Sequence, residues 1–239
     1  MEKKLTRGPN FAADHAFADG FVFSRVSSIE EARSAIKATG AADSDESAAR
    51  LLSVWNRFEQ SAILSKDVKL GINARIVNGN SKDSIRIDGP TAIRGVLRVE
   101  ASGSIEIGKF CYIGDGTILS ARALIEIGQA TLLAHGVQIF DNDSHPTDAW
   151  HREVQFRRML GDKSVSAPLE IAASPVIIGR RCWVGMNSIV MKGVSMGDEA
   201  IVAAGSVVTT TVPSRAIVAG NPARVIKMLE SANNESTEK

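Results

Sequence analysis

The clearest pattern along this chain is an aliphatic residue at every sixth position of its C-terminal third. These residues are Ile178, Val184, Val190, Met196, Val202 and Val208. A small or β-branched residue stands four positions after each of them: Cys182, Ser188, Val194, Ala200, Ser206 and Val212. A period of six fits neither a helix, which repeats at about 3.6 residues, nor an alternating strand. It predicts a solenoid of very short strands, in which every sixth side chain points inward.

A related repeat of 20 residues precedes this stretch. Ile85, Ile105 and Ile125 each begin an Ile-x-Ile unit, and aliphatic residues then continue at intervals of six. Such a unit is three hexads plus two residues at one corner. Three strands per turn predict a triangular coil, with successive coils hydrogen-bonded as parallel strands about 4.8 Å apart. The pattern therefore indicates an all-β solenoid that begins near Val68.

The N-terminal part shows helical rather than hexad spacing. Ser28-Ile29-Glu30-Glu31 has the form of a capping box and predicts a helix that ends near Gly40. A second predicted helix carries its apolar face on Leu51, Trp55, Phe58 and Ala62. We expect residues 1–66 to form a helical region that covers the open end of the solenoid. Residues 1–24 contain Phe11, Phe17, Phe21 and Phe23 and fit no assignment.

The hexad frame is interrupted once, between Asp141 and Pro175. This segment has no period, and a long excursion from a regular solenoid is typical of a functional loop. We expect a structureless loop over residues 141–175 within a β-helix spanning 67–222. After Pro222, the residues Val225, Ile226 and Leu229 predict a short C-terminal helix within residues 223–239, and the last nine residues read as a disordered tail.

Composition excludes several classes of function. The net charge is +1, which gives no basic field for nucleic acid. The apolar runs are too short for a membrane span, and the N-terminus lacks the apolar stretch of a secretory signal. Cys111 and Cys182 both fall at small-residue corner positions, where we expect buried thiols rather than a disulfide. The sequence thus predicts a cytoplasmic protein.

Several motifs resemble the hexapeptide-repeat acetyltransferases. They are the hexads themselves, Trp183-Val184-Gly185, the run Ala203-Ala204-Gly205-Ser206-Val207-Val208, and the closing Gly220-Asn221-Pro222-Ala223. The chain is most similar to the sugar O-acetyltransferases of the maltose, galactoside and exopolysaccharide type. The resemblance covers roughly residues 68–229. It implies a left-handed β-helix, a homotrimer with active sites between subunits, and acetyl-CoA as the acyl donor without a metal.

The resemblance also implies a catalytic residue. His145, in Phe140-Asp141-Asn142-Asp143-Ser144-His145-Pro146, matches the family's catalytic histidine. A neutral imidazole suits the removal of a hydroxyl proton near pH 7, because its unperturbed pKa is about 6.5. Asp143, or else Asp141, is expected to orient the imidazole. Either aspartate could instead bind acceptor hydroxyls or simply cap the start of the loop. Asp141 and Asn142 are the candidates for acceptor binding.

Cofactor residues follow from the same match. The family's coenzyme contacts fall here on Trp183, Gly185, Ala204, Gly205, Thr209, Arg224 and Lys227. Small residues let a ligand approach the backbone closely, and the two cations suit phosphates. The alternatives are that Trp183 is an aromatic residue of a subunit interface and that the cations belong to a solvated face.

The acceptor is less determined. The maltose and galactoside enzymes hold the sugar with an asparagine, and the corresponding stretch Tyr112-Ile113-Gly114-Asp115-Gly116 lacks one. Asp115 is the candidate replacement. Cations of the loop could favour an anionic acceptor, or could equally pair with acidic groups of a neighbouring subunit: Arg152, Arg157, Arg158 and Lys163.

Rival functions remain. An amino-sugar N-acetyltransferase or a drug acetyltransferase would use the same coil. A γ-type carbonic anhydrase would need three histidines as zinc ligands, but the spacing of His145 and His151 does not match that family. A scaffold without catalysis would leave the histidine loop and the cofactor motif without a purpose. The sequence therefore predicts acetyl transfer to a sugar hydroxyl in polysaccharide or lipopolysaccharide synthesis.

Overall fold

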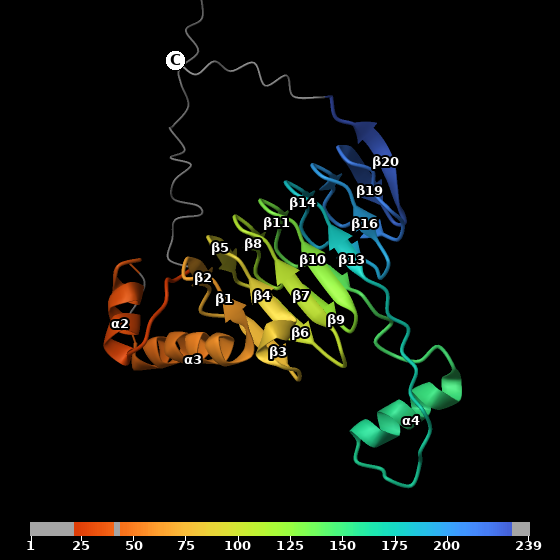
Figure 1. Cartoon of the computed structure of the whole chain (residues 1–239), viewed down its shortest axis with the longest axis horizontal. Helices are drawn as coiled ribbons and strands as arrows, with labels where there is room; N and C mark the ends of the chain where they lie inside the picture. The colour runs from red at the N-terminus through yellow and green to blue at the C-terminus, as the bar shows by residue number, and fades with distance from the viewer. Residues whose placement is uncertain (1–21, 41–43, 231–239) are drawn as a thin grey trace, which may run out of the picture.

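The chain folds as a left-handed parallel β-helix, as the computed structural model in Figure 1 shows, and the described residues place at its N-terminal end the helices α2(Ile29–Lys37) and α3(Asp45–Ser61). The structure describes residues 22–40 and 44–230. The predicted hexads form a three-sided coil because each coil contributes one short strand to each of three sheets. Phe11, Phe17, Phe21 and the predicted C-terminal tail lie outside the described residues.

The three sheets are called faces 1, 2 and 3, in the order in which one coil visits them. Face 1 consists of β1(Ile63–Leu64), β4(Ile85–Ile87), β7(Ser104–Ile107), β10(Leu124–Ile127), β13(Val176–Ile178) and β16(Ser195–Met196). Face 2 consists of β2(Val68–Leu70), β5(Thr91–Ile93), β8(Tyr112–Ile113), β11(Leu132–Leu133), β14(Trp183–Val184), β17(Ile201–Val202), β19(Ala216–Gly220) and β20(Ala223–Met228). Face 3 consists of β3(Arg75–Asn78), β6(Val96–Val99), β9(Ile118–Ala121), β12(Gln138–Phe140), β15(Ile189–Val190) and β18(Val207–Val208).

The repeat of 20 sets the register of the coils. Ile85 pairs with Ile105 and Ile105 with Ile125, so residues at equal places in the repeat stack along the axis. Beyond the interruption the offset becomes 18, and Ile178 pairs with Met196. These side chains are buried in one continuous core. The predicted inward column is confirmed.

The small corner residues also connect neighbouring coils. The Thr91 hydroxyl donates to the Gly108 carbonyl oxygen at 2.9 Å and accepts from the Cys111 amide at 3.2 Å. Thr131 repeats this pattern with Gly179 and Cys182. A buried backbone group without a partner is costly, so these hydroxyls satisfy the amides and carbonyls that the tight corners leave unpaired.

The N-terminal helices are those predicted. Helix α2(Ile29–Lys37) starts at Ser28, whose hydroxyl accepts from the Glu31 amide. Helix α3(Asp45–Ser61) buries Leu51, Trp55 and Phe58 against the first coil. A short 3-10 helix, η1(Lys82–Ser84), follows β3. In Figure 1 α3 lies across the N-terminal end of the solenoid and covers its open core.

The predicted C-terminal helix is wrong. Residues Ala223–Met228 form β20, which returns antiparallel to β19 after Asn221 and Pro222. The last coil leaves β19 with an open edge, and β20 satisfies its backbone groups. Val225 and Ile226 are β-branched and favour a strand, although their spacing also fits a helix.

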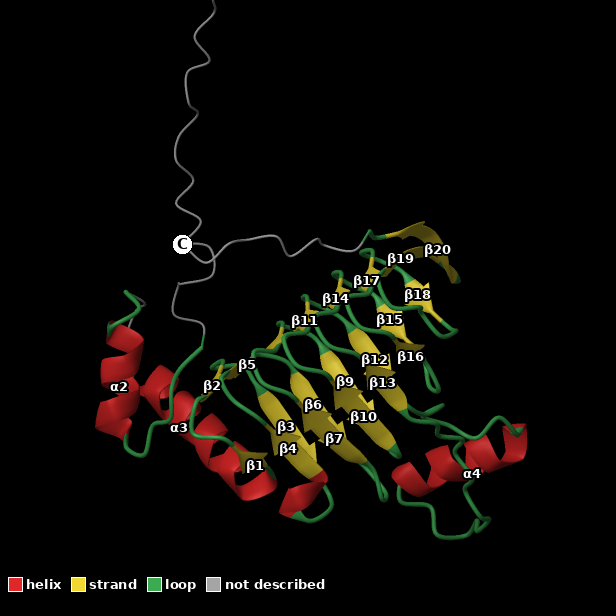
Figure 2. Ribbon diagram, turned by 45° about the horizontal axis from the view of Figure 1, so that its top comes forward, coloured by secondary structure: helices red, strands yellow, loops and turns green. Residues whose placement is uncertain are grey.

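The excursion after β12 is not structureless, as we had expected, because it contains α4(Ala149–Met159). Asp148 caps this helix by accepting from the His151 amide at 2.9 Å. Figure 2 shows α4 standing away from the coils. Val154 is the one buried residue of α4, so the sequence has no apolar stripe from which the helix could be predicted. We call residues 141–175 the arm.

Candidate functional site

The arm is tied to the solenoid where its two ends meet. The Asp143 amide donates to the Ala172 carbonyl oxygen at 3.0 Å, and the Ser174 amide donates to the Asp141 carbonyl oxygen at 2.7 Å. Asn142 and Ala173 form an antiparallel bridge between them. These contacts join residues 141–143 to residues 172–174, and we call these two segments the neck of the arm. They fix the first residues of the arm on the edge between faces 3 and 1.

Asp141 and Asn142 are structural, which corrects the expectation that they bind an acceptor. Asp141 is fully buried, and its carboxylate accepts from the backbone amides of Arg122 at 2.8 Å and Ala123 at 2.7 Å. Asn142 is 5% exposed and donates to the Ser120 carbonyl oxygen and to Asp141. Their polar atoms hold the arm against the previous coil.

Asp143 does not orient the histidine, and this expectation is also wrong. Its Oδ1 accepts from Lys192 Nζ at 2.6 Å, and both side chains are partly buried. Lys192 follows β15 on the next coil, 49 residues along the chain. The ion pair instead fastens the neck of the arm to the coil above it.

His145 itself is exposed on the arm, directly after a tight turn. Its amide donates to the Asp143 carbonyl oxygen at 2.6 Å, and the central residue Ser144 has a φ of 61°. His145 Nδ1 lies 2.8 Å from Gln155 Oε1, an atom of α4. Sequence reasoning missed Gln155 because only the fold of the arm brings it to the histidine.

Helix α4 is held in register with this turn by further contacts. Arg152 donates from one guanidinium nitrogen to the carbonyl oxygens of Pro146 and Thr147, both at 3.0 Å. Arg157 pairs with Asp162 within the arm, and hydrogen bonds from Ser164 and Arg157 lower the pKa of Asp162 to about 2. These two cations are thus committed to the arm itself.

A hollow of about 570 Å³ opens beside the start of α4, and His151 rather than His145 is the histidine that lines it. It lies between the arm and the solenoid edge, and both polar and apolar residues line it. The lining residues are Arg122, Pro146, Thr147, Asp148, His151, Leu169, Glu170, Ile171 and Ala172. A space of this size accommodates a sugar-sized ligand.

Asp115 lies on a different edge, between faces 2 and 3. Its carboxylate is hydrogen-bonded to the Arg94 guanidinium, and His135 Nδ1 lies 3.7 Å from the same oxygen, Oδ2. His135 also packs near the ring of Tyr112, with 6.2 Å between centroids. Within one chain the structure therefore does not bring Asp115 to His145.

The residues matched to the coenzyme contacts divide between edges. Trp183 is 53% exposed on face 2, as its hexad position predicts, and Ala204 and Gly205 are exposed on the edge between faces 2 and 3. Gly185 lies beneath them, where a Cβ atom would come within 2.5 Å of the Ala204 nitrogen. Thr209 instead follows β18 on the edge where the arm leaves.

Arg224 and Lys227 are exposed on β20 rather than on a helix. They keep the expected cationic character at the C-terminal end of the solenoid. Face 3 separates the two edges within one chain, so His145 and the backbone of Ala204 and Gly205 do not line one cleft.

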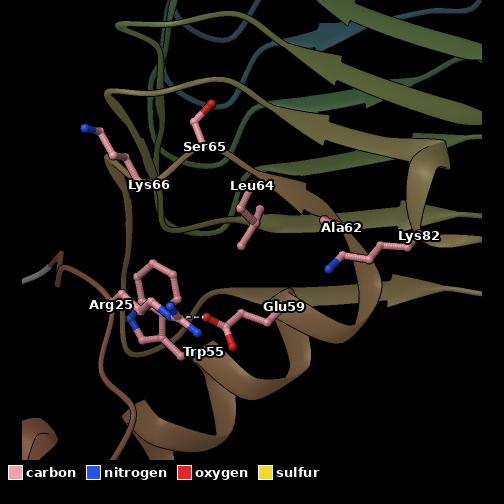
Figure 3. Close-up of a pocket in the computed structure, with 8 residues that line it drawn as sticks. All are labelled: Arg25, Trp55, Glu59, Ala62, Leu64, Ser65, Lys66 and Lys82. Atoms are coloured by element: carbon pink, nitrogen blue, oxygen red, sulfur yellow. Dashed lines mark ion pairs between the residues drawn. The ribbon is translucent and has the colours of Figure 1, made fainter.

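Other candidate sites carry less chemistry. A hollow of about 440 Å³ at the helical end is shown in Figure 3, where Arg25 pairs with Glu59 beside Trp55. It contains neither histidine nor cysteine. Within residues 22–40 and 44–230, no three His, Cys, Asp or Glu side chains are grouped to hold a metal. None of the helices in those ranges has the length and apolarity that a membrane crossing requires.

The repeat region matches a known family model. Residues 175–210 fit the model described as the hexapeptide repeat of succinyl-transferase. A stretch of 67 residues is 46% identical to 2,3,4,5-tetrahydropyridine-2,6-dicarboxylate N-acetyltransferase of Staphylococcus aureus (strain JH9). That match spans 28% of this chain and 28% of the relative's length.

Solved structures with a similar fold are also acyltransferases. The polySia-specific acetyltransferase NeuO has a TM-score of 0.55 and 26% identity, over 73% of this chain and 70% of that one. A mutant of AntD, an N-acyltransferase from Bacillus cereus, was solved with dTDP and coenzyme A. It has a TM-score of 0.56 and 20% identity, over 71% of this chain and 84% of that one. At that identity the likeness shows the fold alone.

Proposed function

We propose that this hexapeptide-repeat protein is an acyltransferase that moves an acetyl group from coenzyme A directly to a sugar hydroxyl. The observation that carries the proposal is the exposed His145, which the arm holds on a solenoid edge and which precedes Pro146, a lining residue of the sugar-sized hollow. The similarity to NeuO and to the Staphylococcus N-acetyltransferase supports the class of reaction. Polysaccharide or lipopolysaccharide synthesis is the proposed setting.

His145 acts as the general base in this proposal. Its ring nitrogen takes the proton of the acceptor hydroxyl while the oxygen attacks the thioester carbonyl carbon. The new C–O bond forms a tetrahedral intermediate, which collapses as the C–S bond breaks. The imidazolium then returns its proton to the departing thiolate, so that free coenzyme A leaves and the ester remains. No acyl group rests on the protein.

The donor would lie along the small-residue edge. Ala204 and Gly205 leave their backbone open to a pantetheine chain, and Trp183 offers an exposed indole as a wall. Arg224 and Lys227 supply positive charge for the phosphates. Thr209 lies on the other edge, so its backbone would meet the donor bound to a neighbouring copy. Gly185 keeps the two coils beneath this edge close together.

A second copy of the chain would complete the site. In one chain face 3 separates His145 from Ala204 and Gly205, so the two groups meet only if one copy's edge lies against the other edge of its neighbour. This supports the homotrimer implied by the resemblance. Asp115 then belongs to the acceptor side, where its pairing with Arg94 would compete with a sugar hydroxyl.

Transfer to an amine is the second candidate. The Staphylococcus relative is an N-acetyltransferase, and AntD is an N-acyltransferase. An amino acceptor would use the same base to remove a proton from the attacking nitrogen. The panel of acceptors therefore needs sugars, amino sugars and nucleotide-linked forms of both.

The test is thiol release from acetyl-CoA with that panel, in metal-free buffer with and without chelator. We expect release that requires an acceptor and falls by about 10²- to 10⁴-fold in His145→Ala, the usual contribution of a general base. Met159→Ala, at the exposed end of the same helix and outside the lining of the hollow, is the matched control and should remain active. Failure to bind acetyl-CoA by calorimetry, or activity abolished by the chelator, would overturn the proposal.

A further inference from the structure

We infer that Gln155 is a positioning residue that fixes the tautomer of His145 and leaves its Nε2 atom as the base. This inference deepens the proposed function and rests on it for its catalytic meaning. Its physical content, a single tautomer selected by a neutral amide of the arm, stands on the geometry alone.

The orientation of the Gln155 amide is determined by its second contact. Gln155 Nε2 lies 3.2 Å from the Ser144 carbonyl oxygen. A carbonyl oxygen only accepts hydrogen bonds, so the NH₂ end of the amide must face Ser144. The oxygen Oε1 therefore faces His145, at 2.8 Å from Nδ1. The reverse orientation would place two acceptors against each other.

The tautomer of His145 follows from the same reasoning. Oε1 of Gln155 has no proton to give, so Nδ1 must carry the hydrogen of this bond. In a neutral imidazole one nitrogen donates and the other accepts, which leaves the lone pair on Nε2. A base needs that lone pair at the atom that meets the acceptor hydroxyl.

The arm holds Gln155 where this contact forms. Val154 is fully buried beside it, and Arg152 of the same helix binds the carbonyl oxygens of Pro146 and Thr147. The turn and the helix thus form one unit, with Gln155 joined to two successive residues of the turn. Helix α4 thus supplies the hydrogen-bonding partner of His145.

A neutral partner has a different consequence from a carboxylate. Asp143, the acidic neighbour in sequence, is paired with Lys192, and Arg152 is held by carbonyl oxygens. His151 and Asp148 contact each other at the start of α4, with 3.2 Å between Nδ1 and Oδ1. Among the described residues, the hydrogen-bonding partner of the imidazole is therefore a neutral amide, which orients the ring.

The experiment uses the full chain labelled with ¹⁵N-histidine, with the four histidines assigned by substitution. Long-range ¹H–¹⁵N spectra above pH 8 should show His145 protonated at Nδ1. In Gln155→Leu, which keeps the size but removes the acceptor, the signals should move toward a mixture of tautomers. Glu153→Gln, on the same helix and away from the histidine, is the control and should keep the wild-type pattern.

Kinetics then separate positioning from structure. Gln155→Leu should lower kcat by about 10- to 100-fold, with KM for acetyl-CoA within about twofold, because the base is misdirected while the donor site is intact. Gln155→Glu restores an acceptor with a charge, so it should keep the Nδ1–H tautomer. In the pH–rate profile of Gln155→Glu, the acidic limb should move to higher pH by about one unit.

The two proposals fail in different ways. An unchanged tautomer together with unchanged turnover in Gln155→Leu would overturn the role of Gln155. If the wild type shows a fixed tautomer but transfers acetyl to no acceptor, the proposed function fails while the positioning stands. Should Gln155→Leu fold poorly by circular dichroism, Gln155→Glu still decides, because loss of its Nδ1–H signature would contradict the inference.

Discussion

Cys111 shows how one side chain serves both packing and hydrogen bonding in this coil. It is 3% exposed at a corner, and its thiol approaches the Gly128 carbonyl oxygen at 3.2 Å. Burial raises its pKa from an ordinary value of 9.0 to about 11, because a thiolate in that corner would lose its hydration. Cys182 occupies the equivalent place, and its pKa is raised for the same reason.

This burial predicts a specific loss of stability at alkaline pH. The folded state binds the thiol proton more tightly than the unfolded state does, because its pKa is higher. The unfolded thiol therefore ionises first as the pH rises, and the folded state loses stability between about pH 9 and about pH 11. We expect the free energy of unfolding to fall by about 1–3 kcal/mol over that range because of Cys111.

Urea titrations at pH 7, 9 and 10.5 test the point, with Cys111→Ala as the reference. The variant starts less stable because it leaves a small cavity, but its decline with pH should be shallower than that of the wild type. Parallel declines in the two proteins would show that Cys111 does not contribute.

The arm is the element on which the proposed chemistry depends, and the strands of the coil pair with each other across it. The neck contacts between residues 141–143 and 172–174 bring the two ends together. The sheets continue across the interruption, since β10 pairs with β13 and β12 pairs with β15. The insertion therefore hangs from an already complete solenoid.

Replacing residues 144–171 with two glycines should consequently leave the coil folded. We expect the far-ultraviolet circular dichroism of the sheets to persist and the melting temperature to fall by only a few degrees, because the removed segment buries little. Acetyl transfer should be lost with His145 and Gln155. A shortened chain that fails to fold would show that the arm is part of the core instead.

At the scale of the whole molecule, the three faces differ in their outward side chains. Face 2 carries an apolar column in register: Tyr112, Leu132, Trp183, Ile201 and Ile217. Face 3 carries Val96, Ile118, Gln138, Ile189 and Val207. Face 1 instead presents Arg86, Glu106 and Glu126. Leu132 and Trp183 of the face 2 column are 47% and 53% exposed. Neighbouring exposed apolar side chains of this kind mark a surface that binds another protein surface.

We expect these two faces to carry the self-association that the proposed site requires. Leu132→Glu places a charge in the apolar column of face 2 and should convert the assembly to single chains. Light scattering after gel filtration should give a wild-type mass of about three times 25.5 kDa and a variant mass near 25.5 kDa.

Ile177→Glu supplies the matched control, because Ile177 also points outward but lies on face 1 beside Glu126. Its mass should equal that of the wild type. A wild-type protein that elutes as a single chain, or a Leu132→Glu variant that keeps the full mass, would contradict the assignment of the interface to face 2.

The coil could be predicted from the chain because its signal is local and repeated. Every sixth residue meets the same narrow interior, so the period, the buried columns, the corner residues and the capped N-terminal helices all follow from spacing. His145 and the small-residue run near Gly205 were likewise visible as motifs, although their roles stay predictions.

The tertiary structure decided two kinds of feature. Some depend on contacts between residues far apart in the sequence, and others depend on which polar side chains become buried. Lys192 pairs with Asp143, 49 residues away in the sequence. Helix α4, whose sequence has no apolar stripe, brings Gln155 to His145. The strand β20 forms because β19 leaves an edge to cover, whatever its helical spacing suggests. Burial made Asp141 structural although it stands in the stretch that resembles the family's histidine motif. Local periodicity thus determined the scaffold, whereas long-range pairing and burial decided which polar residues are free to act.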